Sequence, residues 1–254
     1  MLRLAEPVEY ASKVLFNGVR LDGRQISSAR GFSIERGILE KTGNSAAVKI
    51  GQTAVVAGLV LSTTISPSQG FLTVSVSHPA VNRRESSALS QKVLDAVRAG
   101  VDLKKLTISG KNVWHIEVAL VVLEDQGGLL DACVSAAAGA LAKIRLPSLD
   151  KDLKAVEGST SVVFEQRVVD CPRVPLVITF KSINGRWLID PCLDEETASQ
   201  ATISLGSVSD DVFVLERIGE CSAEVISQEI IPAARHVLVE RRMQLKSALL
   251  ASNT

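Results

Sequence analysis

The sequence predicts an α+β fold in which one domain, residues 1–254, is made of two related halves. In the first half, approximately residues 18–147, several strand-like runs lead into a helix rich in small residues. The second half, approximately residues 159–254, repeats this order and ends in a long helix. Strands that come in groups before a helix favour α+β over strictly alternating α/β architecture.

The first half is expected to form most of its sheet from apolar or alternating runs. Residues 71–76 alternate as a half-buried strand, and residues 46–50 and 53–62 form a hairpin around Gly51-Gln52. Further strands are expected at residues 32–39, 107–108 and 113–123, a short helix at 7–16 ahead of this half, and helices at 86–99 and 129–142. The 86–99 helix follows from the spacing of Leu89, Val93 and Val97 on one face.

The second half begins after a charged stretch, residues 147–158, which we interpret as a surface loop between the halves. Strands are expected at residues 160–166, 176–183, 187–190, 202–207 and 212–218, with a turn at Asn184-Gly185. A final helix is expected over residues 222–250, and Pro232 should kink or interrupt it.

Composition excludes some functional classes. Lys plus Arg and Asp plus Glu both number 28, so a free-standing nucleic-acid binder driven by bulk charge is not expected. A local basic patch remains possible, and near-zero net charge suits a subunit that associates. No run of 18 apolar residues indicates a membrane helix, and the first residues lack the apolar core of a signal peptide. The four widely spaced cysteines, with no CxxC pair, indicate packed thiols of an intracellular protein (Cys133, Cys171, Cys192 and Cys221).

The segment at residues 125–132 has the form of a phosphate site with unsuitable side chains. An apolar strand runs into Gly127-Gly128 and then into a helix, so backbone N–H groups and the helix dipole could receive an anion. The first turn, however, offers Leu130 and Asp131 instead of Arg, Lys, Ser or Thr. We expect the charge of Asp131 to repel a phosphate.

Two arginine-containing segments are candidates for RNA contacts, each with a structural alternative. Arg83-Arg84 is predicted to lie on the loop before a helix, where it could grip phosphates or be a solvated pair. Residues 20–24, Arg-Leu-Asp-Gly-Arg, could be functional through Arg24, but a tight turn flanked by surface charges explains them as well.

Residues 190–196 hold four carboxylates in seven residues. Such a cluster could hold a divalent cation through oxygen ligands, and an acidic loop or strand edge is the plainer alternative. Elsewhere the sequence has no GxGxxG, GxxxxGK[ST] or HExxH motif, and none of its three histidines has a known catalytic spacing.

Four segments taken in order resemble the motifs of the RNase PH family. They are the RLDGR turn at residues 20–24 with Arg30 behind it, the hairpin at 43–53, the Gly-Gly helix start at 125–132, and the Asp-Pro…Glu-Glu segment at 189–196. The likeness extends from about Glu6 to the last helix, and within the family it is nearest to the non-catalytic ring subunits of the eukaryotic exosome, of the exosome component 8 type. The Glu-Pro-Val-Glu-Tyr opening at residues 6–10 is similar to that branch.

The resemblance implies two similar βα halves with mixed sheets packed against helices. It implies a six-membered ring of RNase PH-like subunits, RNA-binding cap proteins and single-stranded RNA in the central channel, in the nucleus, nucleolus and cytoplasm, with no membrane association. Active members use phosphate to shorten RNA 3′ ends and hold it with an Arg and a hydroxyl residue, whose places here are taken by Leu130 and Asp131. The metal-binding carboxylates of active members correspond to Asp190 and Glu196, which would be vestigial here.

We therefore expect a non-catalytic exosome ring subunit without a cofactor, in which Arg83, Arg84 and, less strongly, Arg24 contact RNA. An active phosphate-dependent 3′–5′ exoribonuclease with Mg²⁺ on Asp190 and Glu196 is the alternative from another functional class. A free-standing monomeric binding protein is a third hypothesis.

Overall fold

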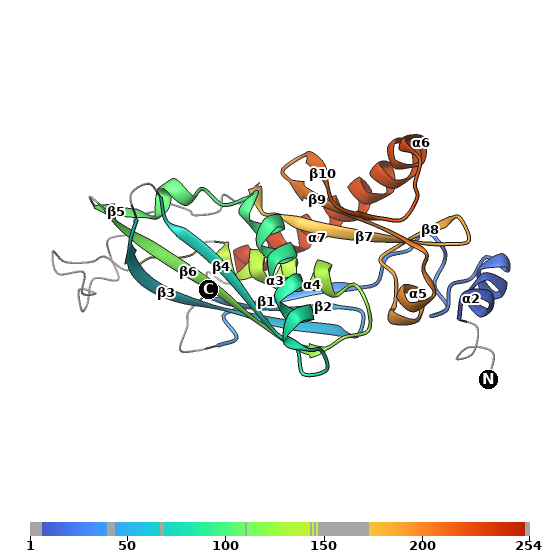
Figure 1. The fold of residues 1–254 in the computed structure, drawn as a ribbon, viewed down its shortest axis with the longest axis horizontal. Helices are drawn as coiled ribbons and strands as arrows, with labels where there is room; N and C mark the ends of the chain where they lie inside the picture. Colours follow the sequence, from blue (N-terminus) through green and yellow to red (C-terminus); the bar gives the residue numbers. More distant parts are fainter. Residues whose placement is uncertain are drawn as a thin grey trace.

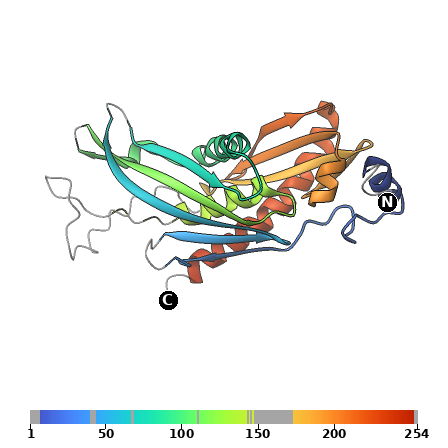
Figure 2. The same ribbon diagram turned by 60° about the horizontal axis from the view of Figure 1, so that its bottom comes forward.

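The computed structural model describes residues 7–39, 44–66, 69–109, 111–142, 144, 146 and 173–251. Two β-sheets form the frame of the molecule, and helices α3 (Arg83–Arg98) and α4 (Leu129–Leu141) lie between them (Figures 1 and 2). The long C-terminal helix α7 (Ile231–Ala251) crosses both sheets, packing on a strand of each.

The first sheet comes wholly from the first half of the chain. Its strand order is β1-β2-β3-β6-β4, and the short β5 also pairs with β6. Only the β4–β6 pair is parallel among these strands. The strands are β1 (Phe32–Arg36), β2 (Ser45–Ile50), β3 (Thr53–Ile65), β4 (Phe71–Ser77), β5 (Thr107–Ser109) and β6 (Asn112–Glu124).

The helix α4 is the centre of the fold. It contacts β2 and β3 of the first sheet and β7 of the second, and all its residues from Asp131 to Leu141 are buried. Its small side chains allow this close approach. A Cβ added at Gly139 would lie 2.6 Å from Cδ1 of Ile34 and 3.1 Å from Cβ of Ala46, so only glycine fits there. The composition of α4 is therefore explained by packing between two sheets.

The second sheet is antiparallel, with the order β10-β9-β7-β8. Its strands are β7 (Leu176–Ile183), β8 (Arg186–Ile189), β9 (Ala201–Val208) and β10 (Asp211–Ile218). The short helix α5 (Leu193–Ala198) follows β8, and α2 (Pro7–Phe16) packs against α5 and β7. Between β10 and α7 lie α6 (Ala223–Val225) and a π-helical turn, η3 (Ile226–Ile230); the remaining short helix, η1 (Leu103–Leu106), precedes β5.

Most predicted elements are confirmed within one to three residues, and three differ. Residues 193–198 form a helix where an acidic loop or strand edge was expected. The final helix is not broken at Pro232; the π-helical turn η3 ends two residues before it, and Pro232 is the second residue of α7. The helix expected from residue 86 begins at Arg83, because the side chain of Asn82 accepts a hydrogen bond from the Glu85 N–H and caps it.

The expected strand at 160–166 and the expected loop at 147–158 lie outside the described residues. Of the helices that the structure describes, none combines the length and the apolarity that crossing a membrane requires.

Candidate functional site

The Gly-Gly turn between β6 and α4 has the backbone shape of an anion cradle. Gly127 and Gly128 both have positive φ angles, 88° and 68°, which favour glycine. The turn is fixed from both sides. The Thr53 hydroxyl donates to the Gly127 carbonyl at 2.6 Å, and the Asp125 carboxylate accepts from the Gly127 N–H at 3.0 Å. The turn is therefore preformed. Whether it can bind an anion depends on the partners of its remaining N–H groups.

The Gly128 N–H, which caps α4, already has a carboxylate partner. Glu196 Oε1 accepts from it at 2.9 Å, and Leu193 N–H donates to the Gln126 carbonyl at 3.0 Å, which ties α5 to the turn. Burial raises the pKa of Glu196, and the Gly128 N–H opposes this by stabilising the ionised form. The Gly128 N–H is thus already engaged by a carboxylate of the protein itself.

Asp131 does not face the turn, so the expected repulsion of phosphate by this residue is wrong. It is fully buried inside the fold, and its two oxygens accept from the Thr179 N–H at 3.0 Å and hydroxyl at 2.7 Å. Burial raises its pKa to about 7, against the opposing effects of Arg241 and Thr179. Asp131 therefore joins α4 to β7, and the carboxylate that contacts the turn is that of Glu196.

Leu130 is half-buried and packs against the main hydrophobic core. It supplies no polar group to the turn.

Asp190 lies behind the turn among arginine side chains. Arg30 donates to it from Nη2 at 2.7 Å, from Nε at 3.2 Å and from its backbone N–H at 2.6 Å. Nη2 of Arg241 and Nη1 of Arg24 lie 3.5 and 3.7 Å from Oδ2. Although burial acts to raise the pKa of Asp190, Arg30 and Arg241 together bring it below its usual range. Asp190 is therefore the centre of a buried ion-pair cluster.

Asp190 and Glu196, the candidate vestigial metal ligands, are both engaged by other groups of the protein. Three guanidinium groups around Asp190 repel a cation. Glu196 accepts a hydrogen bond from the Gly128 N–H. Within the described ranges, no group of three or more His, Cys, Asp or Glu is placed to hold a metal ion.

Asp190 also has an unusual backbone conformation, with φ of 50°. Hydrogen bonds on both sides of the residue hold it there. Its N–H donates to the Thr179 carbonyl at 2.9 Å, and its carbonyl accepts from Arg20 at 3.1 Å and Arg24 at 3.0 Å. The strain is therefore maintained by contacts from distant parts of the chain.

The turn at residues 20–24 is not simply a tight turn with surface charges. Arg20 is 1% exposed and forms a two-pronged ion pair with Glu195, with Nε to Oε1 at 3.0 Å and Nη2 to Oε2 at 2.5 Å. It also donates to the carbonyls of Ser28 at 3.0 Å and Ile189 at 2.7 Å. Although burial acts to raise the pKa of Glu195, Arg20 holds it below the usual range. Glu195, whose partner the sequence did not predict, joins the N-terminal segment to α5.

Arg24 is engaged inside the protein, which contradicts its assignment to RNA. Its side chain is 16% exposed and donates to Asp22 at 2.6 Å, to the Ser28 carbonyl at 2.8 Å and to the Asp190 carbonyl at 3.0 Å. Such a side chain reinforces the Arg20 turn.

Arg83 and Arg84 are exposed and lie in the first turn of α3, not on the preceding loop. Cations are unfavourable at a helix N-terminus because the dipole is positive there. Arg83 also lines an open groove between α3 and β4 of about 490 Å³.

Comparison with known proteins identifies the family of this chain. The family model described as 3′ exoribonuclease family, domain 1, matches residues 28–147. The exosome complex component Rrp42 of Sulfurisphaera tokodaii is 34% identical, over 79% of this chain and 78% of the relative. The chain belongs to the RNase PH family.

Other family members cover nearly the whole chain. Rrp42 of Saccharolobus solfataricus is 30% identical over 91% of this chain and 90% of the relative. A solved archaeal exosome core matches with a TM-score of 0.77 and 25% identity, over 96% of this chain and 98% of that one. An Archaeoglobus fulgidus exosome with RNA bound to the active site matches with the same TM-score and identity, over 95% and 99% of the two chains. The expected RNase PH-like fold is confirmed.

Proposed function

We propose that this chain is a non-catalytic RNase PH-like subunit of an exosome core ring, which scaffolds the ring and lines its RNA channel during 3′–5′ RNA processing and degradation. The observation that carries the proposal is the hydrogen bond from Gly128 N–H to Glu196 Oε1 at 2.9 Å. Its relatives in the family are exosome components, which supports the ring assignment.

The loss of phosphorolysis follows from the charges at the turn. A phosphate approaching Gly128 would have to displace a carboxylate, and Leu130 offers it no hydrogen bond. Positioning a nucleophile and stabilising developing charge each contribute several kcal/mol to catalysis. A site that lacks both contributions has no means to drive the reaction.

Glu196→Gln separates this proposal from an active exoribonuclease. The amide keeps an acceptor for Gly128 N–H and nearly the same volume, but it removes the carboxylate that a metal would require. The assembled ring is incubated with single-stranded RNA, Mg²⁺ and phosphate, and nucleoside diphosphate release is measured, with Asp194→Asn on the same helix as the matched control. We expect both rings to match the wild type. A selective loss of at least tenfold in the Glu196→Gln ring would contradict the proposal.

The outer face of the first sheet supports assembly with ring neighbours. The strand register places Val60, Phe71, Val121 and Leu123 on the face opposite the buried Ile116, and all four are 44–61% exposed. No helix in the described part of the chain packs on this face; α3 and α4 both lie on the other. Exposed apolar side chains grouped on one face are typical of protein interfaces. We assign this face to a neighbouring RNase PH-like subunit.

RNA contact is proposed for Arg83 and Arg84. Both are exposed in the first turn of α3, and single-stranded RNA is held mainly through its phosphates. The assignment predicts weaker RNA binding by the ring when either arginine is neutralised.

The finer assignments rest on the sequence. The exosome component 8 type is supported by the opening at residues 6–10 and by the RLDGR turn. RNA-binding cap proteins as partners, and a location in nucleus, nucleolus and cytoplasm, are proposals that follow from that type. Native mass measurement of the chain co-expressed with RNase PH-like partners tests the ring directly. A chain that stays monomeric in that experiment would contradict it.

A further inference from the structure

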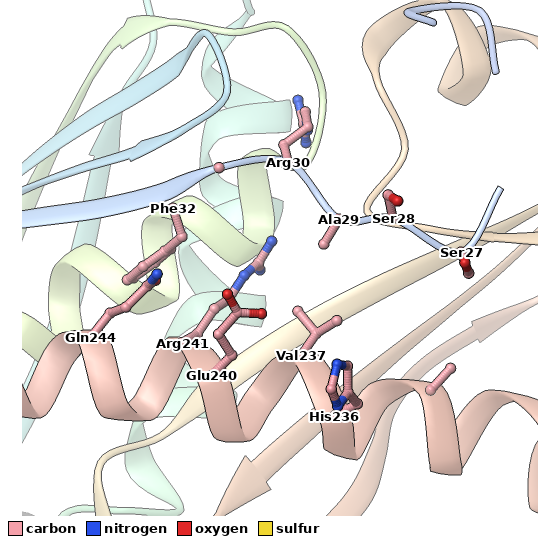
Figure 3. A pocket seen from close by; sticks show the side chains of 12 residues that line it. Ser27, Ser28, Ala29, Arg30, Phe32, His236, Val237, Glu240, Arg241 and Gln244 are labelled. Carbon is pink, nitrogen blue, oxygen red and sulfur yellow. The ribbon is translucent and has the colours of Figure 1, made fainter. Parts of the chain in front are cut away.

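A cavity of about 610 Å³ lies between the segment Ser27–Phe32 and one face of α7. Its α7 wall is made by residues at helical spacing, with Val237 and Arg241 inside and exposed side chains of His236, Glu240 and Gln244 around the opening (Figure 3). The volume lies within the range of small-molecule sites, roughly 300–1,000 Å³.

Arg241 and Arg30 are the two arginines in the lining of this cavity, and Arg241 is the more deeply buried. Its side chain is 2% exposed, yet Nε, Nη1 and Nη2 have no hydrogen-bond acceptor within the described part of the chain. The nearest carboxylate oxygens, of Asp131 and Asp190, lie 3.6 and 3.5 Å away, beyond good hydrogen-bond length. Unsatisfied buried donors are costly and in native proteins usually have a partner.

The guanidinium is held in place without being saturated. The two carboxylates attract it from one side, and the ring of Phe32 lies 5.6 Å from its central carbon on another. Figure 3 shows the side chain rising from α7 into the space below the Ser27–Phe32 segment. A planar fork of donors fixed in this way matches the two oxygens of an oxyanion.

The rest of the lining fits the same ligand chemistry. Ser27, Ser28 and Gln244 contribute hydroxyl and amide groups, and Phe32 and Val237 contribute an apolar wall. Glu240 at the opening is the one carboxylate among the lining residues, and together with Asp131 and Asp190 behind the guanidinium it opposes anion binding. Glu240 should therefore weaken the binding of an anion, and neutralising it should strengthen that binding.

We propose that this cavity binds a small oxyanion of the phosphate class, inorganic phosphate or the phosphate of a nucleoside monophosphate, on the guanidinium of Arg241. The site differs from the Gly127–Gly128 turn. Oδ1 of Asp190 lies on the turn side, 3.3 Å from where a Gly128 Cβ would stand, whereas Oδ2 lies on the Arg241 side. Arg30 and Asp190 separate the two places.

Calorimetric titration of the full-length chain with inorganic phosphate, and separately with uridine monophosphate, tests the proposal at constant ionic strength. We expect one saturable site. Arg241→Lys keeps the charge but loses the fork and should weaken binding at least tenfold. Glu240→Gln should strengthen it about threefold or more, an effect that a purely structural role of Arg241 would not produce. Lys246→Gln, an exposed cation on the same helix outside the cavity, is the control and should match the wild type. Tighter binding of the nucleotide would assign a phosphate monoester, and equal binding would assign free phosphate.

Methyl NMR of the wild-type chain locates the anion even if the Arg241 variant fails to fold. Phosphate should shift the Val237 methyl signals and leave those of Leu130 unchanged. A shift confined to Leu130, no saturable binding, or equal affinity in wild type and Glu240→Gln would overturn the proposal. The ring function proposed above does not depend on this cavity.

Discussion

Removing Arg20 should destabilise the chain more than removing Arg24, the other arginine of the RLDGR turn. Arg20→Met deletes both bonds to Glu195, at 3.0 and 2.5 Å, and those to the carbonyls of Ser28, Ile189 and Asp190. Glu195 is fully buried, and its remaining cation would be Arg24, whose Nη2 lies 4.0 Å from Oε2. Breaking a buried pair from one side costs about 3–5 kcal/mol. For a chain of this size that corresponds to a fall in melting temperature of about 6–20 °C.

The assay is urea denaturation of the wild type, of each single variant and of the double variant Arg20→Met/Glu195→Met. Replacing both partners removes the buried carboxylate as well, so the double variant should recover part of the loss, with a coupling energy of at least about 1.5 kcal/mol. Arg24→Met is the control, because Arg24 is partly exposed and its strongest partner, Asp22, lies near the surface. A loss below about 1 kcal/mol for Arg20→Met, or additive effects in the double variant, would refute the claim that this ion pair fixes the turn to α5.

Three further predictions concern buried charge, RNA and assembly. The pKa of Asp131 is raised from 3.8 to about 7, so the folded chain keeps a proton that the unfolded chain releases. The free energy of unfolding should therefore fall as pH rises from about 4 to 7. Asp131→Asn should remove this pH dependence, measured by urea denaturation at each pH. Arg83→Gln should weaken binding of the ring to single-stranded RNA of any sequence and lower the slope of log affinity against log salt by about 0.7. Arg98→Gln, at the other end of α3, is the control and should change neither quantity. Equal salt slopes for the two variants in fluorescence anisotropy would count against channel contact. Val60→Lys should prevent ring assembly, measured by native mass spectrometry, and should change the melting temperature of the chain by no more than about 2 °C, because surface substitutions usually cost under about 0.5 kcal/mol. Met243→Lys, at an exposed position on α7, is the control and should assemble normally. Normal assembly of the Val60→Lys chain would show that this face is not in the interface.

The fold was largely predictable because its strands and helices carry local patterns. The alternation at 71–76 and the apolar spacing in α3 locate those elements to within a few residues. The helix α5 was missed because six residues do not show a helical period, and its four neighbouring carboxylates resemble a loop. The π-helical turn before Pro232 has no sequence signal that distinguishes it from an ordinary helix.

The residues of the Gly-Gly turn were predictable from the sequence, but the side chains that contact it from distant parts of the chain were not. The Gly-Gly turn, and the lack of an Arg, Lys, Ser or Thr directly after it, follow from residues 127–131 alone. The occupant of the turn does not, because Glu196 is 68 residues away from Gly128, and Arg20 and Glu195 are 175 residues apart. Arg241 has no sequence signal at all; only the fold shows that it is buried beside Asp131 and Asp190. Charged residues that meet through the tertiary fold are read as surface residues when only neighbours in sequence are considered.

The most direct test of the non-catalytic assignment is phosphorolysis by a ring in which this chain carries the only family site left intact. The partner subunits are inactivated at their own sites, and phosphate-dependent release of nucleoside diphosphates from single-stranded RNA is measured with Mg²⁺. With Glu196 on the Gly128 N–H, we predict release no greater than in a reaction without phosphate. Phosphate-dependent release within tenfold of the unmodified ring, abolished by Glu196→Gln, would contradict the account.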